Sequence, residues 1–222
     1  MTSRPAAGPP LAWAEPAGPV FPRDHRWPVT IEAAGVRLAP FRRRHRAEWD
    51  RVRERNADWL RPWDATPPDG ISHGTTAEMI ARLNADAKTG RTVPWVIRDL
   101  RAERTPLIGQ CTLNNVTYGS ALFASVGYWI DREWAGRGIM PVAVALAVDY
   151  AIKVMRLHRI EICLRPENAA SLRVVEKLGF RDEGIRPRYI HIAGAWRDHR
   201  CFALDASEVG PGLLGRVIGG RR

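Results

Sequence analysis

Apolar residues along the middle of the chain repeat with two different spacings. Short runs rich in β-branched and aromatic residues predict strands at 36–40, 93–98, 107–116, 122–130, 159–164, 180–192 and 196–204. Apolar positions three and four residues apart predict helices at 42–60, 75–88, 139–154 and 168–178. This order of elements predicts one α/β (α+β) domain in which helices flank a mixed sheet.

The two ends of the chain lack this periodicity. Residues 1–30 hold seven prolines together with many alanines and glycines, a composition typical of a flexible leader. Its exceptions are three bulky apolar residues that could pack on the domain: Trp13, Phe21 and Trp27. Residues 206–222 are rich in glycine and end in two arginines, so we expect a loose basic tail. The sequence therefore predicts a single domain over residues 31–205.

The stretch from Ser125 to Val142 joins a predicted strand to a predicted helix through a turn that contains Gly136 and Gly138. Free N–H groups and the positive end of the helix dipole attract an anion at such a helix start. Glycines allow the backbone to approach a phosphate closely. Position 141 is a proline, so the turn lacks the third glycine of a dinucleotide-binding fold. The stretch predicts a site for the pyrophosphate of a nucleotide-like cofactor.

Composition bounds the class of protein. With 222 residues, 45% hydrophobic and 26% charged, the chain resembles a soluble globular protein. It has no apolar run of the roughly 20 residues that a membrane helix needs and no pattern of a signal peptide, so we expect a cytoplasmic protein. Three cysteines without close spacing argue against a disulfide framework and a Cys-x-x-Cys metal site. We expect Cys111, Cys163 and Cys201 to be small buried residues, and we expect no metal.

The chain is strongly basic, with 34 Lys and Arg against 24 Asp and Glu and a formal charge of +10. This surplus favours anionic partners, which include the phosphates of a cofactor, RNA, or an assembly that contains RNA. The densest positive cluster runs from Arg42 to Arg46. It predicts either a solvated helix face or a contact with ribosomal RNA or an acidic surface.

Two later segments give the glycine turn a family context. They are Arg165-Pro166-Glu167-Asn168-Ala169-Ala170-Ser171 and Glu176-Lys177-Leu178-Gly179-Phe180. With Gly136-Arg137-Gly138 they resemble the GCN5-related N-acetyltransferases, the GNAT family. The resemblance implies a mostly antiparallel sheet, a splayed strand before the turn and acetyl-CoA as co-substrate. The family signature begins with Gln or Arg three residues before its first glycine; here Glu133 stands there, with Arg132 one residue early.

The resemblance implies a set of residues that hold acetyl-CoA through the splayed strand, the turn and the last predicted helix. They are Tyr128, Trp129, Ile130, Arg132, Gly136, Arg137, Gly138, Ile139, Met140, Asn168 and Ser171. Ser171 is the candidate general acid, because a hydroxyl near the CoA sulfur can donate to a leaving thiolate. The alternatives are an inert helix residue for Ser171 and a simple helix N-cap for Asn168.

Further segments resemble the RimJ branch of this family, the ribosomal-protein-alanine N-acetyltransferases. They are Asn115 to Ser120, Val126-Gly127-Tyr128 and Trp196-Arg197-Asp198-His199. This branch implies acetyl transfer to the α-amino group of a protein N-terminus that begins with Ala, in a small-subunit ribosomal protein. Candidate substrate-binding residues are Trp59, Trp63, Asn115, Tyr118 and Tyr189. Two alternatives stay open: an acetyltransferase of a small-molecule amine, and a basic ribosome- or RNA-binding factor.

The proton acceptor is not defined by the sequence. Many relatives carry a Glu on the strand before the turn, where this chain has Ser125. The candidate bases are Asp198 and His199, with Glu54 and Glu183 as more remote ones. Asp198 could instead pair with an arginine such as Arg197 or Arg186. His199 could be a hydrogen-bonded strand residue, and a water relay is a further alternative.

Overall fold

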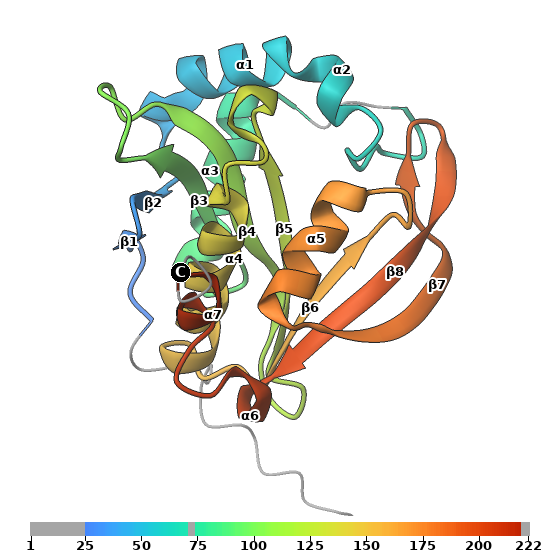
Figure 1. Ribbon diagram of the computed structural model, residues 1–222. Helices are drawn as coiled ribbons and strands as arrows, with labels where there is room; N and C mark the ends of the chain where they lie inside the picture. The colour runs from blue at the N-terminus through green and yellow to red at the C-terminus, as the bar shows by residue number, and fades with distance from the viewer. Residues whose placement is uncertain (1–24, 71–73, 219–222) are drawn as a thin grey trace, which may run out of the picture.

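The computed structural model describes residues 25–70 and 74–218 (Figure 1). The strands are β1 (Ile31–Ala33), β2 (Val36–Pro40), β3 (Val93–Asp99), β4 (Leu107–Thr117), β5 (Phe123–Ile130), β6 (Arg159–Leu164), β7 (Arg181–Ile192) and β8 (Ala195–Asp205). The helices are η1 (Arg43–His45), α1 (Arg46–Arg55), α2 (Ala57–Leu60), α3 (Thr76–Lys88), η2 (Arg132–Trp134), α4 (Ile139–Lys153), α5 (Ala169–Leu178), α6 (Ala206–Val209) and α7 (Leu214–Ile218). All seven predicted strands are confirmed, with ends within one residue.

The eight strands form one sheet in the order β1-β2-β3-β4-β5-β6-β8-β7. Every neighbouring pair is antiparallel except β5 and β6, which confirms the predicted mixed and mostly antiparallel sheet. The parallel pair is short: Phe123 to Ser125 pair with Arg159 to Glu161, and the two strands diverge beyond that point. This divergence is the predicted splay before the glycine turn.

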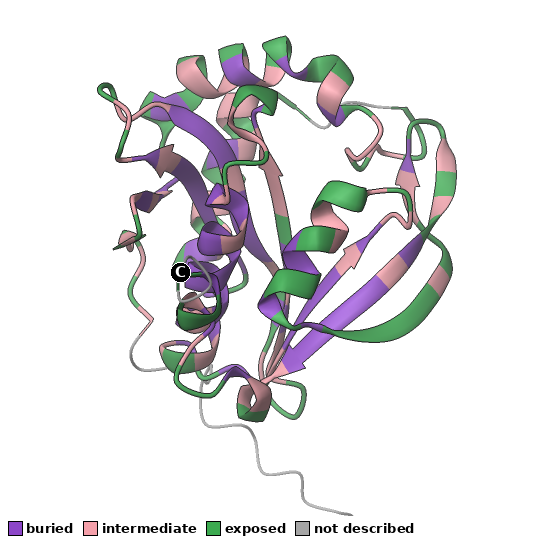
Figure 2. Ribbon diagram, in the orientation of Figure 1, coloured by how far each residue is buried: buried purple, intermediate pink, exposed green. Residues whose placement is uncertain are grey.

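Helices cover both faces of the sheet (Figure 1). The face that carries α4, α5 and α7 holds the larger core, in which α4 is apolar on nearly all sides and buried along most of its length (Figure 2). A smaller core lies under α1 and α3 and is built on Phe41, Val52, Ile80, Val96 and Leu107. The two packed faces fix β4 and β5, the strands that lead into the glycine turn.

The predicted helix at 42–60 is interrupted. A 3₁₀ turn precedes α1, and Asn56 separates α1 from α2 with non-helical backbone angles. Asn56 is buried, and its side-chain amide donates to the Val52 carbonyl at 2.8 Å and to Asp131 Oδ1 at 3.0 Å. The break therefore follows from a polar side chain that links α1 to the turn after β5. The predicted helices at 75–88, 139–154 and 168–178 are confirmed within one residue.

The expectation of a loose tail from residue 206 is wrong for residues 206–218. These residues form α6 and α7, and their buried side chains Val209, Leu213 and Val217 belong to the larger core. The Asp149 carboxylate accepts hydrogen bonds from the Leu213 and Leu214 amides at 2.7 and 3.3 Å. Neither helix exceeds five residues, so neither shows a readable period.

The N-terminal expectation is partly corrected. Trp27 packs edge-on against Trp95, and its Nε1 donates to Asn84 Oδ1 at 3.1 Å, so the last residues of the expected leader join the domain. Trp13, Phe21 and the rest of residues 1–24 lie outside the described residues, as do residues 219–222. Strand β1 was not predicted; it is three residues long and forms a hairpin with β2.

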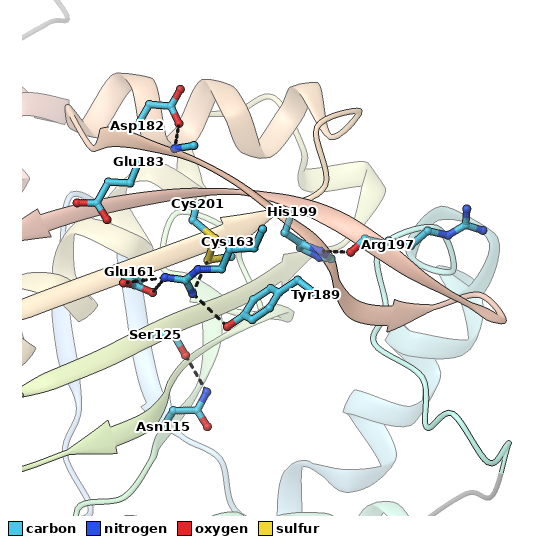
Figure 3. The surroundings of a disulfide bond; sticks show 12 residues. Asn115, Ser125, Glu161, Cys163, Asp182, Glu183, Tyr189, Arg197, His199 and Cys201 are labelled. Carbon is cyan, nitrogen blue, oxygen red and sulfur yellow. Dashed lines mark hydrogen bonds and ion pairs between the residues drawn. A yellow bond between two sulfur atoms is a disulfide. The ribbon is translucent and has the colours of Figure 1, made fainter.

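The cysteines divide into a pair and a single thiol. Cys163 in β6 lies opposite Cys201 in β8 with Cα atoms 4.1 Å apart, and the two form a disulfide (Figure 3). This corrects the expectation of unpaired cysteines, since the register between the two strands could not be read from the sequence. Cys111 is the expected small buried residue, and burial raises the pKa of its thiol to about 12.

Two further expectations concern ions and membranes. In residues 25–70 and 74–218, no group of three or more His, Cys, Asp or Glu side chains gathers where it could hold a metal ion. None of the helices in this same part of the chain combines the length and the apolar character needed to span a bilayer.

Candidate active site

A cleft of about 930 Å³ opens where β5 and β6 diverge. One part is walled by the glycine turn and the first turns of α4 and α5, with Gly136, Gly138, Asn168 and Ser171 in its lining. Another part is walled by α2 with the loop after it, by β4, by the end of β7 and by His199 in the middle of β8. The cleft therefore runs from the predicted phosphate-binding turn to a second region that has space for another molecule.

The glycine turn has the geometry of an anion site. Gly136 and Gly138 have φ angles of +77° and +73°, which only glycine adopts without strain. Gly138 is the N-cap of α4, and no side chain caps the helix or places an acid in its first turn. The first amides of α4 therefore keep their hydrogen-bonding capacity, and the helix dipole adds positive potential there.

Asp131 holds this turn against α1. It is 1% exposed, and its carboxylate accepts from the Asn56 amide at 3.0 Å, from Arg55, and from the Glu133 backbone N–H at 3.2 Å. Glu133, which departs from the family signature, is exposed and contributes its backbone rather than its side chain. The turn is thus shaped by buried contacts on its N-terminal side.

The two arginines near the turn lie outside the lining of the cleft. The Arg132 guanidinium lies 5.9 Å from the Trp59 ring, and that of Arg137 lies 4.7 Å from the Trp134 ring. Both side chains are exposed. Backbone amides, rather than these arginines, are therefore the groups of the turn that could hold an anion in the cleft, and Ile139 and Met140 supply apolar lining next to them.

The start of α5 brings Asn168 and Ser171 to the cleft. Asn168 is the N-cap, and its Oδ1 accepts from the Ser171 backbone N–H at 3.0 Å. The N-cap interpretation is therefore confirmed, and the same residue lines the cleft. Ser171 is half-buried and also lines the cleft, and its assignment as the general acid stays a prediction.

The splayed part of β5 contributes Tyr128, Trp129 and Ile130 to the lining. The Ile130 carbonyl accepts from Trp59 Nε1 at 3.2 Å, and Trp129 packs edge-on against Trp49. Tyr128 directs its ring toward the larger core, and its hydroxyl oxygen is buried. These contacts hold the end of β5 in place where β6 diverges from it and no longer pairs with it.

Trp59 and Trp63, two of the candidate substrate-binding residues, line the second wall. Arg165 fastens this wall to the end of β6: its Nη1 donates to the Pro62 carbonyl at 2.9 Å, and its guanidinium lies 5.6 Å from the Trp63 ring. On the other side of the loop, the Thr66 N–H donates to the His191 carbonyl at 2.9 Å. The loop after α2 is therefore held at both ends.

A row of polar residues on β4 was missed from the sequence. Gln110, Thr112 and Asn114 alternate with buried apolar residues and all line the cleft. Gln110 accepts from Trp49 Nε1 and donates to Thr112 Oγ1, each at 3.0 Å. The signal was present: polar residues at every second position of a buried strand indicate one polar face.

Three predicted substrate-binding residues do not line the cleft. Asn115 is exposed at an irregularity in the β4–β5 pairing, with φ of +52°, and donates to Ser125 Oγ at 3.2 Å (Figure 3). Tyr118 donates to the Gly90 carbonyl at 3.1 Å and packs against the larger core. Tyr189 is exposed, and its ring lies 5.8 Å from that of His199, which does line the cleft. The structure therefore places none of the three in the cleft lining, and Tyr189 only packs against a lining residue.

Of the candidate bases, His199 lines the cleft. It is 3% exposed, and burial, together with the positive charge of Arg165, lowers its pKa although its Nδ1 contacts the Arg197 carbonyl at 3.0 Å (Figure 3). The carbonyl can only accept, so Nδ1 carries the proton and Nε2 keeps its lone pair. The imidazole is therefore neutral near pH 7 and able to accept a proton.

The carboxylate candidates lie elsewhere. Asp198 is exposed and accepts from the Arg188 backbone N–H at 2.8 Å, so neither arginine expected from the sequence is its partner. Glu183 forms ion pairs with Arg159 and Arg181, and Glu54 is exposed on α1. None of these three lines the cleft, which corrects their assignment as bases.

Glu161, which the sequence did not single out, is the buried carboxylate next to Ser125. It is paired across β5 and β6 with Ser125 and is 8% exposed. Arg159 and Arg186 neutralise it, with N–O distances of 2.9 and 3.0 Å. Glu161 therefore lies beside Ser125, the position at which many relatives carry a glutamate. Its carboxylate is already ion-paired with two arginines.

A family model described as the acetyltransferase (GNAT) domain matches residues 36–181. That match covers most of the chain, so the protein belongs to the GNAT family of acetyltransferases and is an acyltransferase.

Known relatives narrow this class. Over 160 residues the chain is 33% identical to the ribosomal protein uS5-alanine N-acetyltransferase of Escherichia coli, which covers 71% of this chain and 80% of that protein. It is 44% identical over 98 residues to the probable N-acetyltransferase YjcK of Bacillus subtilis, and spans about half (54%) of that relative. The structure of Mycobacterium smegmatis RimJ in complex with CoA-disulfide matches with a TM-score of 0.79 at 36% identity, over 87% of this chain and 95% of the other. These similarities confirm the predicted resemblance to the RimJ branch.

Proposed function

We propose that this protein transfers the acetyl group of acetyl-CoA to the α-amino group of a protein N-terminus that begins with Ala, in a small-subunit ribosomal protein. The observation that carries the proposal is the cleft itself. It joins an uncapped helix start at Gly138 to a hydroxyl at Ser171 and a neutral imidazole at His199. The similarity to a uS5-alanine N-acetyltransferase supports the choice of substrate.

The site fits acetyl-CoA on its own geometry. The first amides of α4 would hold the pyrophosphate, because no side chain occupies them and Gly136 leaves open space where a Cβ would stand. The diverging end of β5 would receive the extended arm of CoA, with backbone groups that β6 does not pair. When bound, acetyl-CoA supplies an activated acetyl thioester.

The chain's own residues would then manage two protons. His199 Nε2 accepts a proton from the substrate amine, whose pKa of about 8 leaves a fraction of it neutral at pH 7. Ser171 donates its hydroxyl proton toward the sulfur that leaves. Trp59, Trp63 and the polar row on β4 form the wall against which the substrate N-terminus would lie.

A direct test uses the purified protein, acetyl-CoA and a set of acceptors analysed by mass spectrometry. The proposal expects one added acetyl group on the N-terminus of an Ala-initiated peptide. The matched control is the same peptide with a blocked N-terminus and an internal lysine, which should stay unmodified. Acetylation of spermidine but of neither peptide would favour the small-amine alternative instead.

The RNA-binding alternative stays a prediction. Arg42, Arg43, Arg44 and Arg46 are exposed, and within the described part of the chain none of them forms an ion pair. Salt-sensitive binding of ribosomal RNA that disappears when these arginines become glutamines would show a contact in addition to catalysis.

A further inference from the structure

The Tyr128 hydroxyl has an unusual position. Among the described residues it is the buried side-chain polar atom that has no hydrogen-bond partner. Other tyrosine hydroxyls in the fold are satisfied: that of Tyr118 donates to the Gly90 carbonyl at 3.1 Å, and that of Tyr150 lies 2.8 Å from His25 Nδ1. A buried hydroxyl without a partner destabilises a fold, so its presence in a cleft needs an explanation.

Ser171 is the side chain whose hydroxyl influences the pKa of Tyr128, although no hydrogen bond of normal geometry joins the two in this structure. Both residues line the cleft, Tyr128 from the splayed end of β5 and Ser171 from the first turn of α5. Burial raises the pKa of Tyr128 strongly, and the Ser171 hydroxyl partly offsets this. Tyr128 therefore stays protonated, and its O–H is a donor that no acceptor among the described residues satisfies.

A serine hydroxyl rotates freely unless something fixes it, and it has two lone pairs that can accept. A donor directed into one lone pair orients the serine proton away from that donor and polarises the O–H bond. Tyr128 is placed to be this donor, and a phenylalanine there would fill the same space without the hydroxyl.

We propose that Tyr128 is a positioning residue: its O–H donates to Ser171 Oγ when acetyl-CoA occupies the cleft, and this directs the Ser171 proton at the CoA sulfur. The inference rests on the proposed function. During transfer the C–S bond breaks, the sulfur keeps its electron pair, and the new C–N bond forms. Ser171 stabilises the thiolate by a hydrogen bond, and Tyr128 loses no proton.

The first test is a double-mutant cycle with Tyr128→Phe and Ser171→Ala. Tyr128→Phe should lower kcat about tenfold, the equivalent of one hydrogen bond, with KM for acetyl-CoA unchanged within about twofold. The double variant should be no slower than Ser171→Ala alone, because Tyr128 acts only through Ser171. The control Tyr150→Phe, which removes a hydroxyl from α4 outside the cleft, should keep the wild-type kcat.

The second test measures the pKa of the CoA thiol in the bound state and does not require turnover. The ultraviolet absorbance of bound CoA thiolate gives the pKa of the bound thiol, which Tyr128→Phe should raise by about 1. Affinity for desulfo-CoA, which lacks the sulfur, should be the same in both proteins.

Three results would overturn the inference: an unchanged kcat in Tyr128→Phe, a loss in the double variant that multiplies the two single losses, or an unchanged thiol pKa. In each case an intact N-terminal acetylation by the wild type would leave the proposed function standing. A wild-type protein that neither binds CoA nor acetylates a peptide would remove both.

Discussion

Substitutions at two glycines with nearly the same backbone conformation can distinguish an effect on ligand binding from an effect on stability. Gly136 in the cofactor turn has φ of +77° and Gly119 in the β4–β5 turn has φ of +80°, and no atom lies within 4 Å of a Cβ added at either position. An alanine at either one therefore causes a similar backbone strain of about 1–2 kcal/mol. Only the Cβ at position 136 would stand where a phosphate approaches the first amides of α4.

Gly136→Ala should weaken acetyl-CoA binding on the order of tenfold or more in calorimetry, as the Cβ keeps the phosphate away from the amides. Gly119→Ala should lower the midpoint of urea unfolding about as much as Gly136→Ala does. It should, however, bind acetyl-CoA with the affinity of the wild type. Equal affinities of the two variants would contradict the placement of the pyrophosphate.

His199 sets the expected pH dependence. Burial lowers its pKa below the usual 6.5, and the base must be neutral, so kcat should rise with pH below 6.5 and level off above it. His199→Gln should lower kcat about a hundredfold and remove this limb of the profile. A rise near pH 8 from the substrate amine should remain in kcat/KM of both proteins.

The control for this profile is His158→Gln, which changes an exposed histidine outside the cleft. It should keep both the rate and the low-pH limb. If His199→Gln retained the wild-type profile, a water relay would be the better account of proton removal.

At the scale of single elements, the C-terminal helices are part of the core. Leu213 is 0% exposed before α7, whereas Ile218 at the end of α7 is 48% exposed. Leu213→Ala should lower the free energy of unfolding by about 2–5 kcal/mol, because it leaves a cavity against α4. Ile218→Ala, the matched control, should change it by less than about 0.5 kcal/mol in the same urea titration. If both substitutions changed the free energy of unfolding by the same small amount, the C-terminal segment would be the loose tail expected from the sequence.

The loop after α2 offers a second test at this scale. Arg165→Gln removes the hydrogen bond to the Pro62 carbonyl and the guanidinium over Trp63. The loosened wall should raise KM for the acceptor peptide about tenfold and leave KM for acetyl-CoA unchanged. Arg61→Gln, a change of a largely exposed neighbour, should alter neither constant in steady-state assays.

These elements also show what the sequence could and could not predict. Long periodic segments such as α3 and α4 were predicted within one residue, because apolar spacing reports local structure. The disulfide between Cys163 and Cys201 and the displacement of Asn115 were not predicted, since both depend on strand register. Of the candidate site, the glycine turn and Asn168 follow from local motifs. The hydrogen bond from Arg165 to the Pro62 carbonyl, and the placement of Tyr128 and Ser171 in one cleft, depend on elements that only the fold brings together.

At the scale of the whole molecule, one sheet both carries the hydrophobic core and forms the cleft. The larger core includes strands on both sides of the parallel pair, and the divergence of β5 from β6 opens the cleft. The formal charge of +10 favours both an anionic cofactor and an acceptor within an RNA-containing assembly. Fold and charge are thus consistent with N-terminal acetylation of a ribosomal protein, and neither alone identifies the acceptor.

The N-terminal acetylome of the source organism, compared by mass spectrometry with and without this protein, tests the central claim most directly. The account predicts that acetylation disappears from an Ala-initiated small-subunit ribosomal protein and returns when the wild-type protein is supplied, but not when Gly136→Ala is supplied. An acetylome in which no N-terminus changes would contradict it.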